Sequence, residues 1–171
     1  PQTITFDSLN SVAFGSGPIT LNATSSSGLP VHYSSSDPTV ASVNGNVLTI
    51  LKVGSVTITA YQQGNYNFTA AAPVAQLLTI DKANQTITFF PLPTKTLEEP
   101  DFDLQAFSSA HLWLTYTSSD TLVAKIEGHT LKLVGPGTAT ITASQAGNEF
   151  YNAAASVSQD ITLEEPLAGQ E

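Results

Sequence analysis

Residues 33–60 read YSSSDPTVASVNGNVLTILKVGSVTITA, and the pattern returns 83 positions later, where residues 116–143 read YTSSDTLVAKIEGHTLKLVGPGTATITA. Aligning the chain with itself at this offset gives about 33 identities over 79 positions, with no insertion or deletion. A fixed period of this length is the sequence signature of tandem domains. We therefore predict two domains, residues 1–82 and residues 83–171.

The repeated stretch has the pattern of short strands. Residues 56–60 alternate strictly between apolar and polar or small side chains, so one face is expected to be buried and Thr57 and Thr59 to face outward. Asn44-Gly45 lies between two apolar runs, which predicts a two-residue hairpin turn of a primed type with positive φ at both central residues. By the same alternation, Tyr33 and Tyr116 are expected to lie inside and to fill the core.

The composition favours an all-β protein. The chain has 11 Gly and 10 Pro, and its apolar runs are short. We predict two tandem Ig-like β-sandwich domains of about seven strands each. The chain contains no cysteine, so no disulfide holds either sandwich.

The repeat resembles the bacterial immunoglobulin-like (Big) domain. The resemblance rests on an aromatic residue before Ser-Ser-Asp, then Val-Ala-x-Val/Ile, a glycine turn, and Gly-x-Ala/Val-Thr-Ile-Thr-Ala, in that order in both copies. That family usually has a tryptophan where this chain has Tyr33 and Tyr116. The resemblance implies a β-sandwich used as a stalk or spacer in secreted and surface-anchored bacterial proteins.

Charge argues against two classes of partner. The net charge is −9, there is no arginine, and the second copy holds eleven acids against three lysines. Nucleic acid and anionic membranes attract clusters of Lys and Arg, so neither is an expected partner. No apolar run reaches the roughly 20 residues that span a bilayer. The chain begins at Pro1 directly before a strand, as expected for a piece of a longer exported protein.

The residues offer little for catalysis. His32, His111 and His129 are the only histidines, and none recurs at the matching position of the other copy. Serines are frequent but lie in expected turns, without the sequence context of a nucleophile elbow. We therefore predict that the chain is not an enzyme and has no cofactor, calcium being the one candidate.

The candidate calcium site is the acidic run in the second copy. Glu98, Glu99, Asp101 and Asp103 could supply some of the six to eight oxygens that Ca²⁺ prefers. The alternative is a solvated acidic edge loop, since the spacing of a calcium-binding loop is absent and the first copy has Gly15-Ser16-Gly17-Pro18 at this place.

The candidate ligand site is formed by aromatic residues that only the second copy has. Phe107 stands where the first copy has Thr24, and Trp113 where it has Pro30, with His111 nearby. Strand alternation points Phe107 and Trp113 outward, where rings can stack on sugars or contact a protein. The alternative is that Trp113 packs under a loop or against the neighbouring domain.

The sequence leads to one preferred role and two alternatives. The preferred role is a structural spacer of a secreted or surface-anchored bacterial protein, whose partners are neighbouring repeats of its own chain. The first alternative is an adhesive module that binds a surface glycan or protein through Phe107, His111 and Trp113. The second is an adhesin repeat made rigid by calcium.

Overall fold

The computed structural model describes residues 1–168, and every regular element in this range is a strand. The chain divides into two compact units, Pro1–Ala83 and Asn84–Glu171. The predicted all-β, Ig-like sandwich class is confirmed. The assignment of each unit as a bacterial Ig-like repeat stays a prediction.

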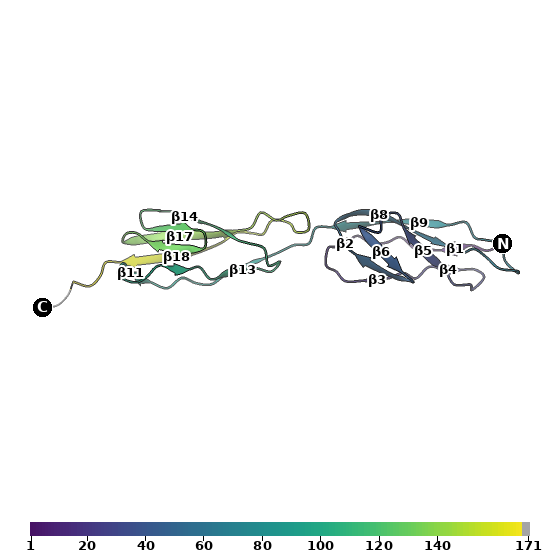
Figure 1. Cartoon of the computed structure of the whole chain (residues 1–171), viewed down its shortest axis with the longest axis horizontal. Coiled ribbons are helices and arrows are strands. Elements are labelled where there is room, and N and C mark those ends of the chain that lie inside the picture. The colour runs from purple at the N-terminus through teal and green to yellow at the C-terminus, as the bar shows by residue number, and fades with distance from the viewer. Residues whose placement is uncertain (169–171) are drawn as a thin grey trace. The chain divides into compact units, whose positions relative to one another are not determined.

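The first unit contains nine short strands, which form three sheets (Figure 1). They are β1 (Ile4–Thr5), β2 (Val12–Ala13), β3 (Ile19–Thr20), β4 (Thr24–Ser25), β5 (His32–Ser35), β6 (Ala41–Asn44), β7 (Val47–Ile50), β8 (Gly54–Tyr61) and β9 (Val74–Asp81). The sheets have the orders β2-β9-β8-β5, β3-β7-β6 and β1-β4. The stretch from Ile19 to Thr24 divides between two sheets, because it pairs with β7 at its start and with β1 at its end.

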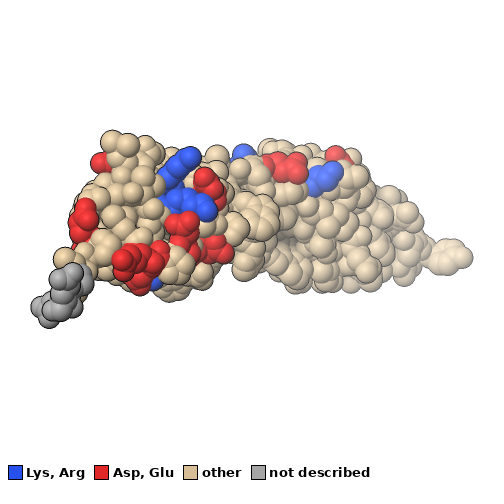
Figure 2. All heavy atoms as spheres, turned by 60° about the vertical axis from the view of Figure 1, so that its left-hand side comes forward, with Lys and Arg blue, Asp and Glu red and all other residues tan. Residues whose placement is uncertain are grey.

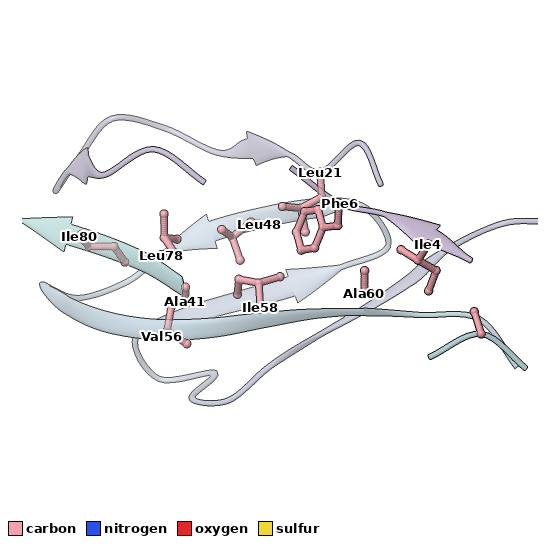
Figure 3. Close-up of a cluster of buried hydrophobic side chains, with 11 residues drawn as sticks. Ile4, Phe6, Leu21, Ala41, Leu48, Val56, Ile58, Ala60, Leu78 and Ile80 are labelled. Carbon is pink, nitrogen blue, oxygen red and sulfur yellow. The ribbon is translucent and has the colours of Figure 1, made fainter. Parts of the chain in front are cut away.

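Apolar side chains from opposing strands form the core of the first unit, which Figure 3 shows between layers of ribbon. The alternation in β8 is confirmed, since Val56, Ile58 and Ala60 are buried and the two threonines between them are not. Leu48 and Leu78 contribute fully buried side chains from β7 and β9.

The second unit repeats this arrangement with its own core. Its strands are β10 (Ile87–Phe89), β11 (Lys95–Thr96), β12 (Phe102–Asp103), β13 (Ala106–Ser108), β14 (Thr115–Ser118), β15 (Ala124–Glu127), β16 (Thr130–Leu133), β17 (Gly137–Ser144) and β18 (Val157–Glu164). The sheets have the orders β11-β18-β17-β14, β12-β16-β15 and β10-β13. Its buried cluster draws only on residues of this unit.

The two tyrosines lie where the sequence predicts. Tyr33 packs against the first core, and its ring meets Phe6 edge-on at 5.7 Å. Its hydroxyl accepts a hydrogen bond from the Ala23 N–H at 2.8 Å. Tyr116 packs against the second core in the same way, beside Phe89 at 6.0 Å, and burial raises the pKa of its hydroxyl.

The two-residue hairpin turn between β6 and β7 is present, but the predicted positive φ at both central residues is wrong. Asn44 pairs with Val47, so the central turn residues are Gly45 and Asn46. Only Gly45 has a positive φ, 62°, and Gly128 of the second unit repeats it at 66°. A glycine with positive φ at the first central position alone is the pattern of a type II′ turn, whose twist also suits a hairpin.

Candidate functional site

The aromatic residues singled out in the second unit line one open hollow. Phe107 lies in β13, Trp113 lies just before β14, and His111 lies in the turn between these strands. Together with Leu112, Leu114, Ser108 and His129, they border a space of about 370 Å³, which we call the Trp113 hollow. Trp113 is 93% exposed, so the alternative in which a loop covers it is wrong.

Strand alternation correctly predicts the direction of these side chains. Leu114 and Tyr116 pack against the core of the second unit, and Trp113, one position earlier, faces solvent. Ala106 also packs inward, and its neighbour Phe107 is 50% exposed.

His111 has an unusual backbone conformation. Its φ is 58°, and no other non-glycine residue in the described range has a positive φ. The matching residue of the first unit is Gly28, with a φ of 79°. A side chain in the left-handed region costs roughly 1–2 kcal/mol, although histidine tolerates it better than most residues. The second unit therefore has an imidazole beside the hollow, at a position whose backbone conformation suits glycine better.

A side-chain amide fixes the position of Trp113. The Gln145 Nε2 donates to the Trp113 carbonyl at 2.5 Å, and the Gln145 Oε1 accepts from the Gly147 N–H at 2.6 Å. In the first unit Gln62 makes the same two contacts, to Pro30 and Gly64. The loop that holds this segment is thus common to both units, whereas the tryptophan it presents is specific to the second.

A second hollow, of about 410 Å³, lies near Phe107. It is bordered by Phe90, Pro91, Leu92, Pro93, Lys95, Phe102, Asp103 and Gln105, and we call it the Phe90 hollow. Phe90 is 51% exposed, and its ring centre lies 6.1 Å from that of Phe107. The linings also meet where His129 Nε2 lies 3.5 Å from Asp103 Oδ2. The two hollows are therefore adjacent.

Two residues of this region were not singled out from the sequence. Phe90 stands where the first copy has Asp7, and His129 where it has Asn46. The signal that identified Trp113 and Phe107, an aromatic ring replacing a non-aromatic residue between copies, would have identified both. His32, in the first unit, packs beside Tyr61 at 5.7 Å and takes no part in this site.

The acidic run is distributed over separate contacts. Glu99 accepts the Thr96 N–H at 2.7 Å and pairs with Lys95, and Asp101 accepts the Leu133 N–H at 2.9 Å and pairs with Lys132. These hydrogen bonds, led by the backbone donors, lower the pKa of both carboxyls.

Asp103 has its own partners as well, since it accepts from the Thr130 hydroxyl at 2.7 Å, and Glu98 lies exposed in the same segment. Within residues 1–168, no three Asp, Glu, His or Cys side chains gather as a metal site would require. Calcium at Glu98, Glu99, Asp101 and Asp103 stays a prediction.

We expect millimolar calcium to raise the melting temperature by no more than about 2 °C, because the ion must displace lysines and backbone donors from these carboxylates. Thermal melting with and without calcium measures this effect. A rise of several degrees that disappears when all four acids are replaced by their amides would instead establish the calcium site.

Comparison with known proteins finds similarity only among solved structures. No family model matches the chain, and no curated protein matches it. Similar structures include a Drosophila N-cadherin structure of domains EC1-4, at 12% identity and a TM-score of 0.39 over 95% of this chain and 49% of that chain. Domains 1-6 of the surface layer protein SbsC have 14% identity and a TM-score of 0.40, over 97% of this chain and 28% of that chain.

A third similar structure is human mucin-like protocadherin EC1-2, at 12% identity and a TM-score of 0.37, covering 97% of this chain and 99% of that chain. All three are similar in fold alone. The function proposed below therefore rests on the residues of this chain.

Proposed function

We propose that this chain is a non-catalytic structural spacer within a larger secreted or surface-anchored bacterial protein of the adhesin type. The observation that carries the proposal is a parallel strand pair in each unit. An early strand lies parallel to the last strand of the same unit, and this happens in both copies.

In the first unit β2 pairs with β9 in parallel, with Val12 opposite Ile80 and Ala13 opposite Asp81. The Phe14 N–H extends the pairing to the Asp81 carbonyl at 2.9 Å. Force applied at the two ends of the unit pulls parallel strands in opposite directions along their axes. Their hydrogen bonds then bear the load together and are not broken one at a time, which suits a module that carries tension.

The second unit closes in the same way. Its β11 pairs with β18 in parallel, with Lys95 opposite Leu163 and Thr96 opposite Glu164. The Leu97 N–H donates to the Glu164 carbonyl at 3.2 Å. The paired residues differ between the two units, so the parallel backbone pairing is retained although the sequence is not.

The polar residues shared by the two copies have structural partners. Gln85 is buried, accepts from the Ser108 hydroxyl at 2.6 Å and donates to the Asn152 carbonyl at 2.9 Å. In the first unit Gln2 donates to the Thr69 carbonyl, which matches the contact to Asn152, and it accepts from the Ser27 hydroxyl, whereas the residue matching Ser108 is Ser25. Positions common to both copies thus stabilise the fold, which supports a repeated structural module over a repeated catalytic one.

Other parts of the proposal rest on the sequence. Residues 82–86, between β9 and β10, are few and lack the Gly and Ser of a flexible linker. The proposed partners are therefore neighbouring repeats of the same chain. Bacterial origin and export follow from the family resemblance. In the described residues, no helix is long and apolar enough to span a membrane.

Single-molecule force spectroscopy on the intact chain, tethered at both ends, tests the mechanical role. We expect two force peaks, each releasing about 25–29 nm of chain, as unfolding of about 80 residues requires. Phe14→Pro removes the N–H that bonds Asp81 and should lower one of the two peaks. Phe14→Ala keeps that N–H and controls for the lost ring, while the unaltered second unit is the internal standard.

Extension without force peaks would contradict the spacer proposal. Equal rupture forces for Phe14→Pro and Phe14→Ala would show that the parallel pair does not carry the load.

A further inference from the structure

We propose that the second unit binds a neutral, linear oligosaccharide of gluco-configured pyranose rings. The oligosaccharide would lie across Phe107, from the Trp113 hollow to the Phe90 hollow. This site goes beyond the spacer role, because a unit can bear load without it.

Exposed aromatic rings supply the apolar part of the site. Phe90, Phe107 and Trp113 are each at least half exposed, and the first two lie 6.1 Å apart. A gluco-configured ring has its hydroxyls at the rim and C–H groups on its faces, so its faces are apolar and stack on aromatic rings. The two adjacent hollows, of about 370 and 410 Å³, give room for consecutive sugar rings.

Polar side chains border the same hollows and can form hydrogen bonds with sugar hydroxyls. His111 and His129 border the Trp113 hollow, and Asp103 borders the Phe90 hollow. Imidazoles donate and accept hydrogen bonds, and a carboxylate accepts them. A mainly apolar site with a few polar groups that fix orientation is typical for small ligands.

Charge selects a neutral sugar over an acidic one. Figure 2 shows more red surface over the second unit than over the first. The three lysines of this unit are all engaged with acids, Lys95 with Glu99, Lys125 with Glu127, and Lys132 with Asp101 and Glu127. An anionic glycan would meet this acidic surface without a free cation, which disfavours its binding.

The fold does not need these aromatic residues. The first unit builds the same sheets with Asp7, Thr24, Gly28 and Pro30 at the positions of Phe90, Phe107, His111 and Trp113. His111 even keeps a left-handed backbone in which glycine would be less strained. Exposed rings and a strained residue gathered at one place, with no role in folding, point to a ligand.

Trp113 is the only tryptophan, so its fluorescence reports on the hollow directly. We expect its emission to shift to the blue and saturate with cellotetraose or tetra-N-acetylchitotetraose, and to stay unchanged with tetragalacturonate. Glucose alone should bind about tenfold more weakly than the tetramer of the same sugar, because it fills one hollow.

Variants with the residues of the first unit test the site without endangering the fold. Phe107→Thr and His111→Gly should each weaken tetramer binding about tenfold while the melting temperature does not fall. Trp113→Pro should abolish tetramer binding. Because this variant has no tryptophan fluorescence, its affinity is measured by isothermal titration calorimetry. Tyr66→Ala removes a fully exposed aromatic residue of the first unit and should leave the affinity unchanged.

Three results would overturn the proposal. The first is no response to either neutral tetramer at about 10 mM, or stronger binding of tetragalacturonate. The second is full affinity in the Phe107 and Trp113 variants. The third is a Trp113 emission that changes with protein concentration alone, which would make the aromatic surface a contact between copies of the chain.

Discussion

Replacing Ile141 by alanine is expected to lower the free energy of unfolding of the second unit by about 3 kcal/mol. Ile141 lies in the middle of β17 with no exposed surface, between Ser118 of β14 and Gln159 of β18. The substitution removes three buried carbon atoms and leaves a cavity that the flanking strands cannot close, because both are fixed by hydrogen bonds.

In a unit of this size the loss corresponds to a fall in melting temperature of roughly 15 °C. Differential scanning calorimetry measures it, with Ile141→Val, expected to cost about 1 kcal/mol, as the graded control. Leu122→Ala, at a side chain that is 78% exposed, should cost less than about 0.5 kcal/mol.

The transition of the first unit should not move, because the two buried clusters share no residue. A loss below about 1 kcal/mol would show that Ile141 is not the centre of its core. A joint shift of both transitions would show that the two units unfold as one.

The sequence predicts those parts of the fold that depend on alternation along one strand. The pattern of residues 56–60 identifies the buried face of β8, and the pattern around Leu114 correctly turns Trp113 outward. Because the side-chain period of a strand is two, a single buried residue determines the direction of its neighbours. The chain offset of 83 residues then carries each assignment to the other copy.

The parts that the sequence did not predict depend on contacts between distant segments. The hairpin turn is type II′ because Asn44 pairs with Val47, a register that the letters Asn-Gly alone do not determine. The candidate site extends past Phe107 because Phe90 follows β10, which pairs with β13, and because the β15–β16 turn brings His129 near Asp103. None of these neighbours is close in sequence.

The same limit applies to the acidic run. Proximity in the sequence suggested a shared metal, whereas in the structure Asp101 pairs with Lys132 and Asp103 accepts from the Thr130 hydroxyl. Each carboxylate meets a donor on β16, which lies about 30 residues further along the chain.

Replacing Gly147 by alanine is expected to destabilise the second unit by about 3 kcal/mol, through strain and not through a cavity. Gly147 has a φ of 80°, and an added Cβ would meet the Tyr151 carbonyl oxygen at 2.5 Å and two further backbone atoms at 2.8 Å. Backbone atoms cannot rotate away as a side chain can, so the loop from Gln145 to Ala154 must shift.

Gly128→Ala is the matched control, because Gly128 also has a left-handed φ, 66°, but has open space around it. Both variants carry the cost of a side chain in the left-handed region, about 1 kcal/mol, so their difference isolates the clash with the loop. We expect urea denaturation to give a difference of about 2 kcal/mol between them.

The clash should also change the position of Trp113 in the candidate site. The Gly147 N–H holds the Gln145 amide, and that amide holds the Trp113 carbonyl. A shift of the loop should therefore change the emission of Trp113 in Gly147→Ala and leave it unchanged in Gly128→Ala. Equal stabilities for the two variants would show that the loop relaxes freely. A large stability loss with unchanged Trp113 emission would show that Gln145 does not fix the tryptophan, and that the Trp113 hollow is held by β13 and β14 alone.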